Sequence, residues 1–384
     1  MMGGREVVIV EAVRSAVGRG HPEKGVYRDV HANVLLGTVL AELVRRAGID
    51  PHQVDDVITG CVTQYGEQSL NIGRNAWLQA GLPYQVPATT LDRQCGSSQQ
   101  ALNFAAAQVA AGVHDVVIAA GVEHMGHLPI NTQERWQDGL GTAWPQELLD
   151  RYAFVPLGIA AEDLARAYDV SREAMDELAA RSHRLAAAAT AEGRFAREIA
   201  PVAGVTADQG IRPATTTASL AALKPAFRDG GSVTAGNASQ ISDGAAALLL
   251  TTREKAAELG LRPRARVLDQ AVVGVDPVLM LEGPIPVTRK LLDRLGLGIG
   301  DLDRYEINEA FASVPIVWER ELSADRERMN VNGGAIALGH PLGASGARLL
   351  TTLLHELERS NTELGLVAMC CRGGIGTGTV IQRV

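Results

Sequence analysis

Two stretches of this sequence share one pattern: residues 41–60 read AELVRRAGIDPHQVDDVITG, and residues 289–308 read RKLLDRLGLGIGDLDRYEIN. Each begins with an amphipathic helical pattern that ends near a glycine, Gly48 or Gly296, the residue type that most often ends a helix. Each then passes through a short acidic turn into a strand-like apolar run. The two stretches align without a gap, which predicts that one helix–turn–strand unit occurs twice.

A second pair of segments follows the first pair in the same order. Cys95 precedes small residues, an Ala-rich helical pattern and a strand at 115–120. His340 likewise precedes small residues, a helical pattern at 343–358 and a strand at 365–370. This second match needs only a small gap, so the sequence favours a duplicated α/β unit.

Short β-branched runs alternate with Ala- and Leu-rich helical patterns along the chain, which is typical of an α/β fold with buried strands. The predicted strands are 6–12, 55–62, 87–92, 115–120, 246–252, 265–273, 304–308, 330–334, 365–370 and 377–382. The predicted helices are 31–48, 70–80, 97–112, 158–168, 172–192, 253–260, 285–296, 310–322 and 343–358.

Residues 121–240 have no counterpart in the repeat. We therefore expect an N-terminal half made of residues 1–120 plus 241–263, an inserted loop domain over 121–240, and a C-terminal half over 264–384. Long insertions in α/β enzymes often form lids or the walls of a ligand site.

Composition excludes several classes of protein. The chain has 384 residues, of which 46% are hydrophobic and 21% charged, so it can build a large core and is not disordered. The net charge of −8 argues against nucleic-acid binding, and the absence of an uncharged apolar run of about 18 residues argues against a membrane span. Four cysteines, two of them adjacent, do not form a disulfide framework and indicate a reducing, cytoplasmic environment.

Cys95 is the first candidate catalytic residue. It stands in Leu91-Asp92-Arg93-Gln94-Cys95-Gly96-Ser97-Ser98, where a strand ends and small residues open a helix. Backbone N–H groups at a helix N-terminus stabilise a thiolate or a developing oxyanion. The alternative is a cysteine that only fills the core, as a small apolar side chain does.

Two further blocks carry candidate partners for that thiol. His340 lies between Gly339 and Pro341 in a Gly-rich loop that opens a helix, and a histidine within reach of a cysteine supplies the base that forms the thiolate. Asn308, in Asn-Glu-Ala-Phe-Ala at a strand end, could orient a water or donate to an oxyanion. The alternatives are a structural histidine and an asparagine that caps a helix.

The last block is Met369-Cys370-Cys371-Arg372 followed by Gly-Gly-Ile-Gly-Thr-Gly. No helix follows it, which argues against a phosphate-binding loop. A cysteine at this strand end could instead act as a second acid and base. His124 and His127 could form half of a metal site, but no Cys or carboxylate stands nearby at zinc spacing, so no metal is predicted.

These four blocks, in this order and at these distances, resemble the thiolase family of acyl-CoA acetyltransferases and 3-ketoacyl-CoA thiolases. The resemblance runs from about residue 7 to 384. It implies a thiolase-like fold, with duplicated α/β halves in a five-layer αβαβα arrangement and an inserted loop domain that binds CoA. It also implies a homodimer or homotetramer, with the segment Gln68–Arg74 similar to the family's stretch near its dimer interface.

The resemblance implies a role for each block. Cys95 would be the nucleophile that carries the acyl group. His340 would be the base for Cys95 and would contribute to the oxyanion hole, and Asn308 would hold a water that completes it. Cys370 would be the general acid and base, with Cys371 a bystander.

The resemblance also implies which residues contact the ligand. Ser239 and Ala235 would lie along the pantetheine arm of CoA. Met280 and Phe311 would lie near the acyl end of the substrate. Leu157 would belong to the acyl pocket.

The implied reaction is thiolytic cleavage of a 3-ketoacyl-CoA by CoA, or Claisen condensation in reverse, with CoA as a substrate and no permanently bound cofactor or metal. One thiol cannot be both acyl carrier and proton shuttle, so the chemistry needs two cysteines. The alternatives are a biosynthetic acetyltransferase that forms acetoacetyl-CoA, a condensing enzyme that uses a carrier protein, and a non-catalytic acyl-CoA-binding homologue.

Four departures from the family pattern concern the active site and the substrate. The family usually has glycine where this chain has Arg372, and a positive φ there would strain an arginine. Leu157 follows Pro156 where the short-chain subgroup has His-Met, which favours a degradative enzyme with a different acyl pocket. Gln240 and the pair Leu281-Glu282 also replace small residues, which suggests an unusual acyl group.

Overall fold

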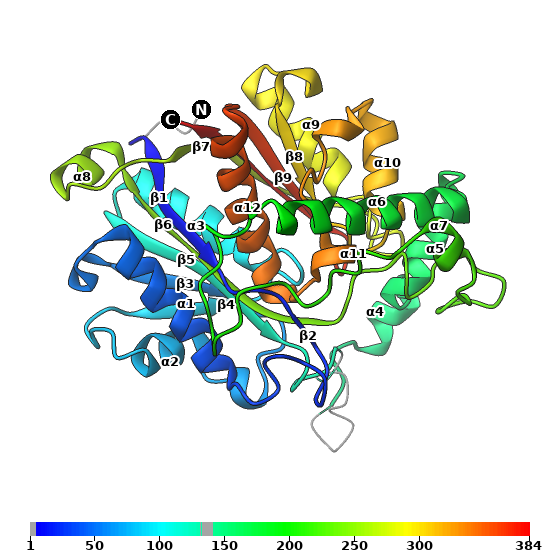
Figure 1. The fold of residues 1–384 in the computed structure, drawn as a ribbon, viewed down its shortest axis with the longest axis horizontal. Helices are drawn as coiled ribbons and strands as arrows, with labels where there is room; N and C mark the ends of the chain where they lie inside the picture. The colour runs from blue at the N-terminus through cyan, green and yellow to red at the C-terminus, as the bar shows by residue number, and fades with distance from the viewer. Residues whose placement is uncertain (1–4, 131, 133–140) are drawn as a thin grey trace.

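The structure is a computed structural model that describes residues 5–130, 132 and 141–384. Within these residues, the strands form one ten-stranded sheet in the order β4-β3-β5-β6-β1-β7-β10-β9-β8, with β2 paired to β6 (Figure 1). The strands are β1 Val7–Arg14, β2 Gly18–Arg19, β3 Asp56–Gly60, β4 Ala88–Leu91, β5 Val116–His124, β6 Ser242–Thr252, β7 Ala265–Gly274, β8 Arg304–Ile307, β9 Leu364–Cys371 and β10 Ile375–Arg383.

Every helix predicted from the sequence is present, with its ends within three residues of the predicted ones. The helices are α1 Ala32–Ala47, α2 Ile72–Gln79, α3 Ser97–Ala111, α4 Gln146–Arg151, α5 Leu157–Ala167, α6 Arg172–Ala191, α7 Thr217–Ala221, α8 Arg253–Glu258, α9 Pro284–Leu295, α10 Ser313–Leu322, α11 Ala335–Leu338 and α12 Ser345–Ser360. The sequence missed α4, α7, α11 and the two-residue β2, all of which are too short to show a clear periodicity.

The topology confirms the duplication. In the first half β6 lies antiparallel between β1 and β5, and β3 and β4 follow in parallel. In the second half β10 lies antiparallel between β7 and β9, and β8 follows in parallel. The two halves meet where β1 pairs with β7 at only two positions, Val8 with Arg266 and Ile9 with Ala265.

The predicted strand at 330–334 is wrong. Its place beside β8 holds a single bridge between Tyr305 and Met329. Asn330 then adopts a positive φ of 47°, and its side-chain amide bonds both the N–H and the C=O of Ile307, each at 2.9 Å. A side chain therefore satisfies the strand edge where the first half uses β4, because Asn330 and Gly333, with φ of 47° and 80°, leave the strand conformation.

Alternation along the strands separates the core into layers, as predicted. In β6, Leu249 packs on the outer side with residues of α1 and α2, whereas Leu248 and Leu250 face α3 and α12. In β9, Val367 faces α3 and α12, whereas Leu366 packs on the opposite side with residues of α9 and α10. The two halves of the sheet therefore lie on either side of the central helices α3 and α12, with further helices on their outer sides (Figure 1). All of these leucines are fully buried, and burial of each side chain contributes about 1.5–3 kcal/mol to the free energy of folding.

The central helices α3 and α12 approach each other closely at their N-terminal ends. Ser98 Oγ accepts a 2.9 Å hydrogen bond from the Ala347 N–H, and a Cβ at Gly346 would lie only 2.4 Å from the backbone N of Gln99. Only small residues permit this contact. Because Cys95 precedes α3 and His340 precedes α12, the contact brings the two predicted catalytic turns together.

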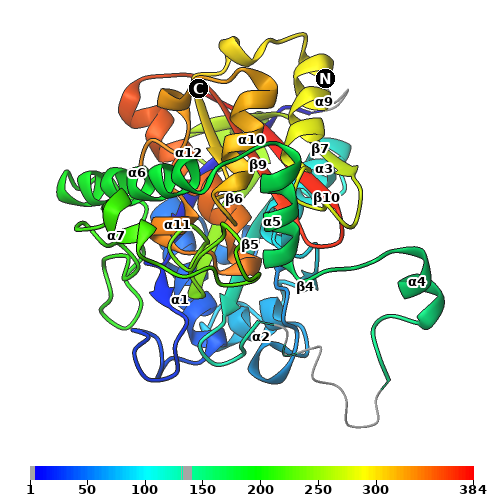
Figure 2. The same ribbon diagram turned by 90° about the vertical axis from the view of Figure 1, so that its right-hand side faces the viewer.

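The segment between β5 and β6 contributes α4, α5, α6 and α7. Helix α6 lies along α11, and α5 contacts α10, so this segment covers the second half as well as the first. Helix α4 stands away from the rest of the fold (Figure 2). Across the described residues, no helix combines the length and apolar character that a membrane span requires.

Candidate active site

Cys95 lies on a tight turn between β4 and α3, as the sequence predicted. Gln94 takes a left-handed conformation with φ of 50°, and the Ser97 hydroxyl donates to the Gln94 carbonyl at 2.6 Å. The Arg93 N–H donates to Ser97 Oγ at 2.9 Å and closes the turn. Cys95 itself is 6% exposed, at a cavity of about 20 Å³, which is room for about one water molecule.

The environment of the Cys95 thiol favours its protonated form. Burial raises the pKa of Cys95 to about 11, and the backbone N–H groups of Arg372 and of Cys95 itself oppose that shift. The carboxylates of Glu123 and Asp92 raise it further. The protonated thiol is therefore favoured at rest, and the nucleophilic role predicted for Cys95 would require a base to take its proton.

His340 is held in one tautomer. Its Nδ1 lies 2.5 Å from Ser345 Oγ, and the single hydroxyl proton of Ser345 is donated to the Pro341 carbonyl at 2.7 Å. Ser345 can therefore only accept from His340, so Nδ1 carries the ring proton. Burial, and then the positive charge of Arg348, lower the pKa of His340 to about 3. Nε2 is left as an unprotonated base.

Asn308 lies beside that base. Its Nδ2 donates to His340 Nε2 at 3.3 Å, which agrees with the tautomer that Ser345 imposes. Its Oδ1 is buried and has no hydrogen-bond partner among the described residues. A buried amide oxygen without a partner is a site where a water or a substrate donor binds favourably.

The two turns meet at the Cys95 cavity. Leu342, two residues after His340, lines it together with Cys95 and Arg372. The carboxylate of Glu123 accepts hydrogen bonds from Gly343 of the second half and from Val62 and Thr63 of the first half. His340, Asn308 and Cys370 do not line the cavity itself.

Adjacent Cys370 and Cys371 point to opposite faces of β9. The Cys371 thiol interacts with the backbone N–H of Gly96 and with the side chain of Thr377, so it is fixed against the start of α3. Cys370 packs in the cluster that contains Met280 and Phe311, the predicted acyl-end residues. Burial and the charge of Cys95 raise the pKa of both thiols.

The strain expected at Arg372 is absent. Positive φ values fall on Gly373, at 86°, and Gly374, at 77°, and Arg372 is not among the residues with positive φ. The backbone N–H of Arg372 forms a hydrogen bond with the Cys95 thiol. Its guanidinium lies 5.3 Å from the ring centre of Trp144, within cation–π range.

Comparison with known proteins agrees with this geometry. The model of the thiolase N-terminal domain matches residues 7–254, and that of the thiolase C-terminal domain matches residues 261–383. This chain belongs to the thiolase family.

Its relatives include the 3-ketoacyl-CoA thiolases of Saccharophagus degradans and Aeromonas salmonicida. They are 46% and 45% identical to this thiolase over 394 residues, covering 99% of this chain and 99% and 100% of their own. The crystal structure of the Bacillus anthracis acetyl-CoA acetyltransferase superposes with a TM-score of 0.90 at 40% identity, and the match covers both chains completely. The thiolase fold and an acyltransferase activity are therefore established for this chain.

Four of the five predicted ligand residues of this thiolase lie near one another. Met280 and Phe311 are buried in the cluster with Cys370. Leu157 packs against that cluster and also lines the cavity at Cys95. The Ser239 N–H donates to the Ala310 carbonyl at 3.0 Å, next to Phe311. Ala235 is exposed on a turn.

Sequence reasoning missed three residues that organise the site. Ser345 orients His340, as described above. Glu309 accepts hydrogen bonds from Ser182, Asn330 and the Ile336 N–H, which fixes the loop that precedes His340. Phe227 stacks edge-on with Phe311 at 5.9 Å. Only Glu309 had a signal in the sequence, because a carboxylate inside an apolar strand-end motif must be paired.

The two histidines considered for a metal site are engaged with protein atoms. His127 Nδ1 lies 2.5 Å from Glu67, and its Nε2 lies 2.7 Å from the Arg28 carbonyl. His124 Nε2 lies 3.1 Å from the Tyr27 carbonyl. In the part of the chain that the structure describes, no group of three His, Cys, Asp or Glu side chains could hold a metal ion.

Proposed function

We propose that this thiolase cleaves a 3-ketoacyl-CoA with CoA through an acyl group bound to Cys95. The observation that carries the proposal is the base at His340: Ser345 fixes the ring proton on Nδ1, and the unprotonated Nε2 accepts a hydrogen bond from Asn308. The names of the relatives, 3-ketoacyl-CoA thiolases at 45–46% identity, support the same substrate class.

In the first half-reaction the Cys95 sulfur attacks the 3-keto carbon while His340 Nε2 takes the thiol proton. Since the pKa of Cys95 is raised to about 11 and that of His340 is lowered to about 3, the proton moves only as the sulfur–carbon bond forms. The carbon–carbon bond then breaks and leaves an enolate. The Cys370 thiol protonates that carbon, acetyl-CoA leaves, and the shortened acyl group stays on Cys95.

In the second half-reaction the Cys370 thiolate takes the proton of an incoming CoA thiol. The CoA sulfur attacks the acyl carbon, and the Cys95 sulfur leaves and recovers its proton from His340. The backbone N–H of Arg372 and a water held by Asn308 would stabilise the oxyanions. No step requires a metal or a redox cofactor, and CoA enters as a substrate.

We also propose that residues 121–240 form the CoA-binding loop domain, between an N-terminal half over 1–120 plus 241–263 and a C-terminal half over 264–384. The lining of the Cys95 cavity by Leu157 supports this division. Ser239 and Ala235 would follow the pantetheine arm, and Met280 and Phe311 would contact the acyl end.

The enzyme would act as a homodimer or homotetramer in the cytoplasm. Leu70 and Tyr84, 87% and 72% exposed, flank the edge strand β4, where a second copy would cover them. All four cysteines are free and buried, which suits a reducing compartment. Light scattering on the purified protein tests the assembly; a monomer at micromolar concentration would contradict it.

The decisive experiment measures thiolysis across a series of 3-ketoacyl-CoAs, from acetoacetyl-CoA to long and branched chains, with Cys95→Ala as the control. We expect activity to rise beyond four carbons and to fall by at least about 10⁴-fold in Cys95→Ala. Activity confined to acetoacetyl-CoA would instead support a biosynthetic acetyltransferase. Absent activity with CoA still bound would support a non-catalytic homologue.

A further inference from the structure

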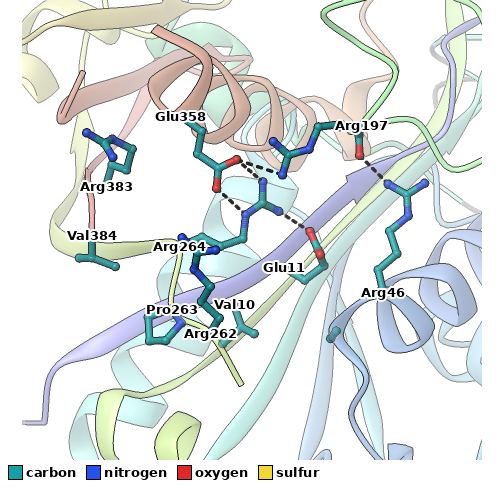
Figure 3. A pocket seen from close by; sticks show the side chains of 11 residues that line it. Val10, Glu11, Arg46, Arg197, Arg262, Pro263, Arg264, Glu358, Arg383 and Val384 are labelled. Carbon is teal, nitrogen blue, oxygen red and sulfur yellow. Dashed lines mark hydrogen bonds and ion pairs between the residues drawn. The ribbon is translucent and has the colours of Figure 1, made fainter. Parts of the chain in front are cut away.

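A second cavity lies away from Cys95, at the junction of the two halves. It has a volume of about 430 Å³ and is lined by residues of β1, the end of α1, the loop before β7, α12 and the end of β10 (Figure 3). It shares no lining residue with the cavity at Cys95. It is therefore separate from the acyl site.

The lining is strongly cationic. Five arginines and two glutamates surround the cavity; they are Arg46, Arg197, Arg262, Arg264, Arg383, Glu11 and Glu358. Positive charges therefore outnumber negative ones, and a carboxylate on Val384 would not reverse the balance. The chain as a whole carries a charge of −8, so this concentration of arginines runs against the average composition.

Two of these arginines are neutralised within the protein. Arg264 is 9% exposed and forms ion pairs with Glu11 and Glu358 at the floor of the cavity (Figure 3). Arg46 pairs with Glu42 at 2.7 Å and donates to the carbonyl of residue 197. These two side chains hold the junction together and are not available to a ligand.

The other three, which we call the rim arginines, are Arg197, Arg262 and Arg383. The Arg197 side chain is 75% exposed, and its guanidinium lies 3.5 Å from the Glu358 carboxylate, which also pairs with Arg264. Arg383 donates only to neutral acceptors, the Thr362 carbonyl and Asn361 Oδ1. Arg262 is exposed and forms no hydrogen bond or ion pair with the described part of the chain. Three arginines from distant segments thus line one cavity: Arg262 and Arg383 have no carboxylate partner among the described residues, and Arg197 shares Glu358 with Arg264.

We propose that this cavity binds a small, multiply charged phosphate anion. Guanidinium groups match phosphate oxygens in geometry and charge. The volume is in the range of small-molecule sites and exceeds what one phosphate needs. No aromatic side chain lines it, so nothing there would stack on a nucleobase. The phosphate chain itself, whether free or part of an ester, is the recognised group.

The test is calorimetric titration with inorganic triphosphate in the presence of saturating CoA, which fills any phosphate site of the substrate. The variant Arg197→Gln/Arg262→Gln removes two exposed rim arginines, of which only Arg197 forms an ion pair, at 3.5 Å, with the Glu358 that Arg264 also holds. The matched control Arg289→Gln/Arg326→Gln removes two exposed arginines elsewhere, each paired with one glutamate.

We expect one triphosphate per chain, a Kd that rises at least about fivefold in the rim variant, and an unchanged Kd in the control. Triphosphate should raise the Tm of the wild type and the control more than that of the rim variant. Thiolysis without triphosphate should be the same in all three proteins. ATP should bind about as tightly as triphosphate, since the base adds nothing.

Three results would overturn the proposal. They are no binding by the wild type, equal weakening in the rim variant and the control, and tight binding of ATP without binding of triphosphate. The last result would indicate a nucleotide site that depends on the base.

Discussion

The turns that carry Cys95 and His340 occupy equivalent places in the two halves of the fold, yet they are built differently. The Cys95 turn follows the four-residue strand β4 and reaches α3 directly. The His340 turn follows a single bridge at Met329 and passes through α11 and a 3₁₀ turn at Leu342–Ala344 before α12 begins. One half has kept its edge strand, and the other has replaced it with a longer loop.

The difference shows how a duplicated scaffold supplies two distinct chemical groups. The short turn fixes Cys95 through the left-handed Gln94 and the hydrogen bonds of Ser97, and leaves it at a cavity. The longer loop surrounds His340 with partners: Ser345 on Nδ1, Asn308 on Nε2, and the Gln240 carbonyl on its N–H at 3.3 Å. A nucleophile needs access to substrate, whereas a base needs a defined tautomer.

The largest expected effect separates the two adjacent cysteines at the end of β9. Cys370→Ala should lower thiolysis by at least about 10³-fold, because the enolate loses its proton donor. Cys371→Ala, the matched control, should retain activity within about tenfold, since that thiol is fixed against Gly96.

Intact-protein mass spectrometry can detect the acyl-enzyme intermediate in the same variants. Cys370→Ala should still accumulate acyl-Cys95 from an acyl-CoA. Equal losses in both variants would contradict the assignment of opposite faces to Cys370 and Cys371.

A smaller loss of activity is expected when the hydrogen bond between Ser345 and His340 is removed. Ser345→Ala should lower kcat about 10- to 100-fold, because Nδ1 loses the acceptor that keeps the proton off Nε2. Ser345→Thr, which keeps the hydroxyl, should recover most of the activity. The pH profile of kcat should change in the alanine variant only; an unchanged profile there would assign Ser345 a merely structural role.

The contact that joins the two turns can be broken at Gly346. A Cβ there would lie 2.4 Å from the Gln99 backbone, so Gly346→Ala should lower the free energy of unfolding by about 1–3 kcal/mol. Gly300→Ala is the control, because nothing lies within 4 Å of its Cβ position. Urea unfolding monitored by circular dichroism measures the stability of both variants. Equal midpoints for the two variants would show that the close contact between α3 and α12 is not needed for stability.

The smallest effect is a pH dependence of opposite sign in the two turns. The pKa of His340 is lowered in the folded state, so its contribution to stability is lost as pH falls below about 6.5; at pH 6 the loss is about 1 kcal/mol. The pKa of Cys95 is raised, so its contribution is lost as pH rises above about 8.5, again by about 1 kcal/mol at pH 9.

The measurement is the free energy of unfolding from pH 6 to 9. His340→Asn should reduce the loss on the acid side only, where His183 and His355, whose pKa values are also lowered, account for the rest. Cys95→Ala should reduce the loss on the alkaline side only, where the other buried thiols, whose pKa values are also raised, account for the rest. The assignment would be contradicted if His340→Asn changed the profile on the alkaline side, or if Cys95→Ala changed it on the acid side.

Much of the fold followed from local signals. Helix α1 ends at Gly48 and α9 at Gly296, both in the left-handed conformation that their glycines predicted. The strands were found because their apolar runs are buried on both faces. The strand predicted at 330–334 is absent because Asn330 and Gly333 adopt positive φ, and the Asn330 side chain makes the hydrogen bonds to Ile307 instead.

In the candidate site, too, some features followed from local sequence signals and others did not. The motifs around Cys95, His340, Asn308 and Cys370 could be read from the sequence as sites of nucleophilic chemistry. The convergence of their turns depends on Ser98, Gly346 and the Glu123 carboxylate, which come from separate segments. The Arg372 backbone was misjudged because positive φ fell on the two glycines that follow it.

The sequence by itself therefore determined the duplication, the helices and the chemical groups, because periodicity, glycine and motif order are properties of neighbouring residues. Only the tertiary structure decided which face of β9 Cys370 occupies, which nitrogen of His340 carries the proton, and where the rim arginines converge. Those outcomes depend on burial and on hydrogen bonds between segments tens to hundreds of residues apart. No local pattern encodes them, since each partner is chosen by how the two halves pack together.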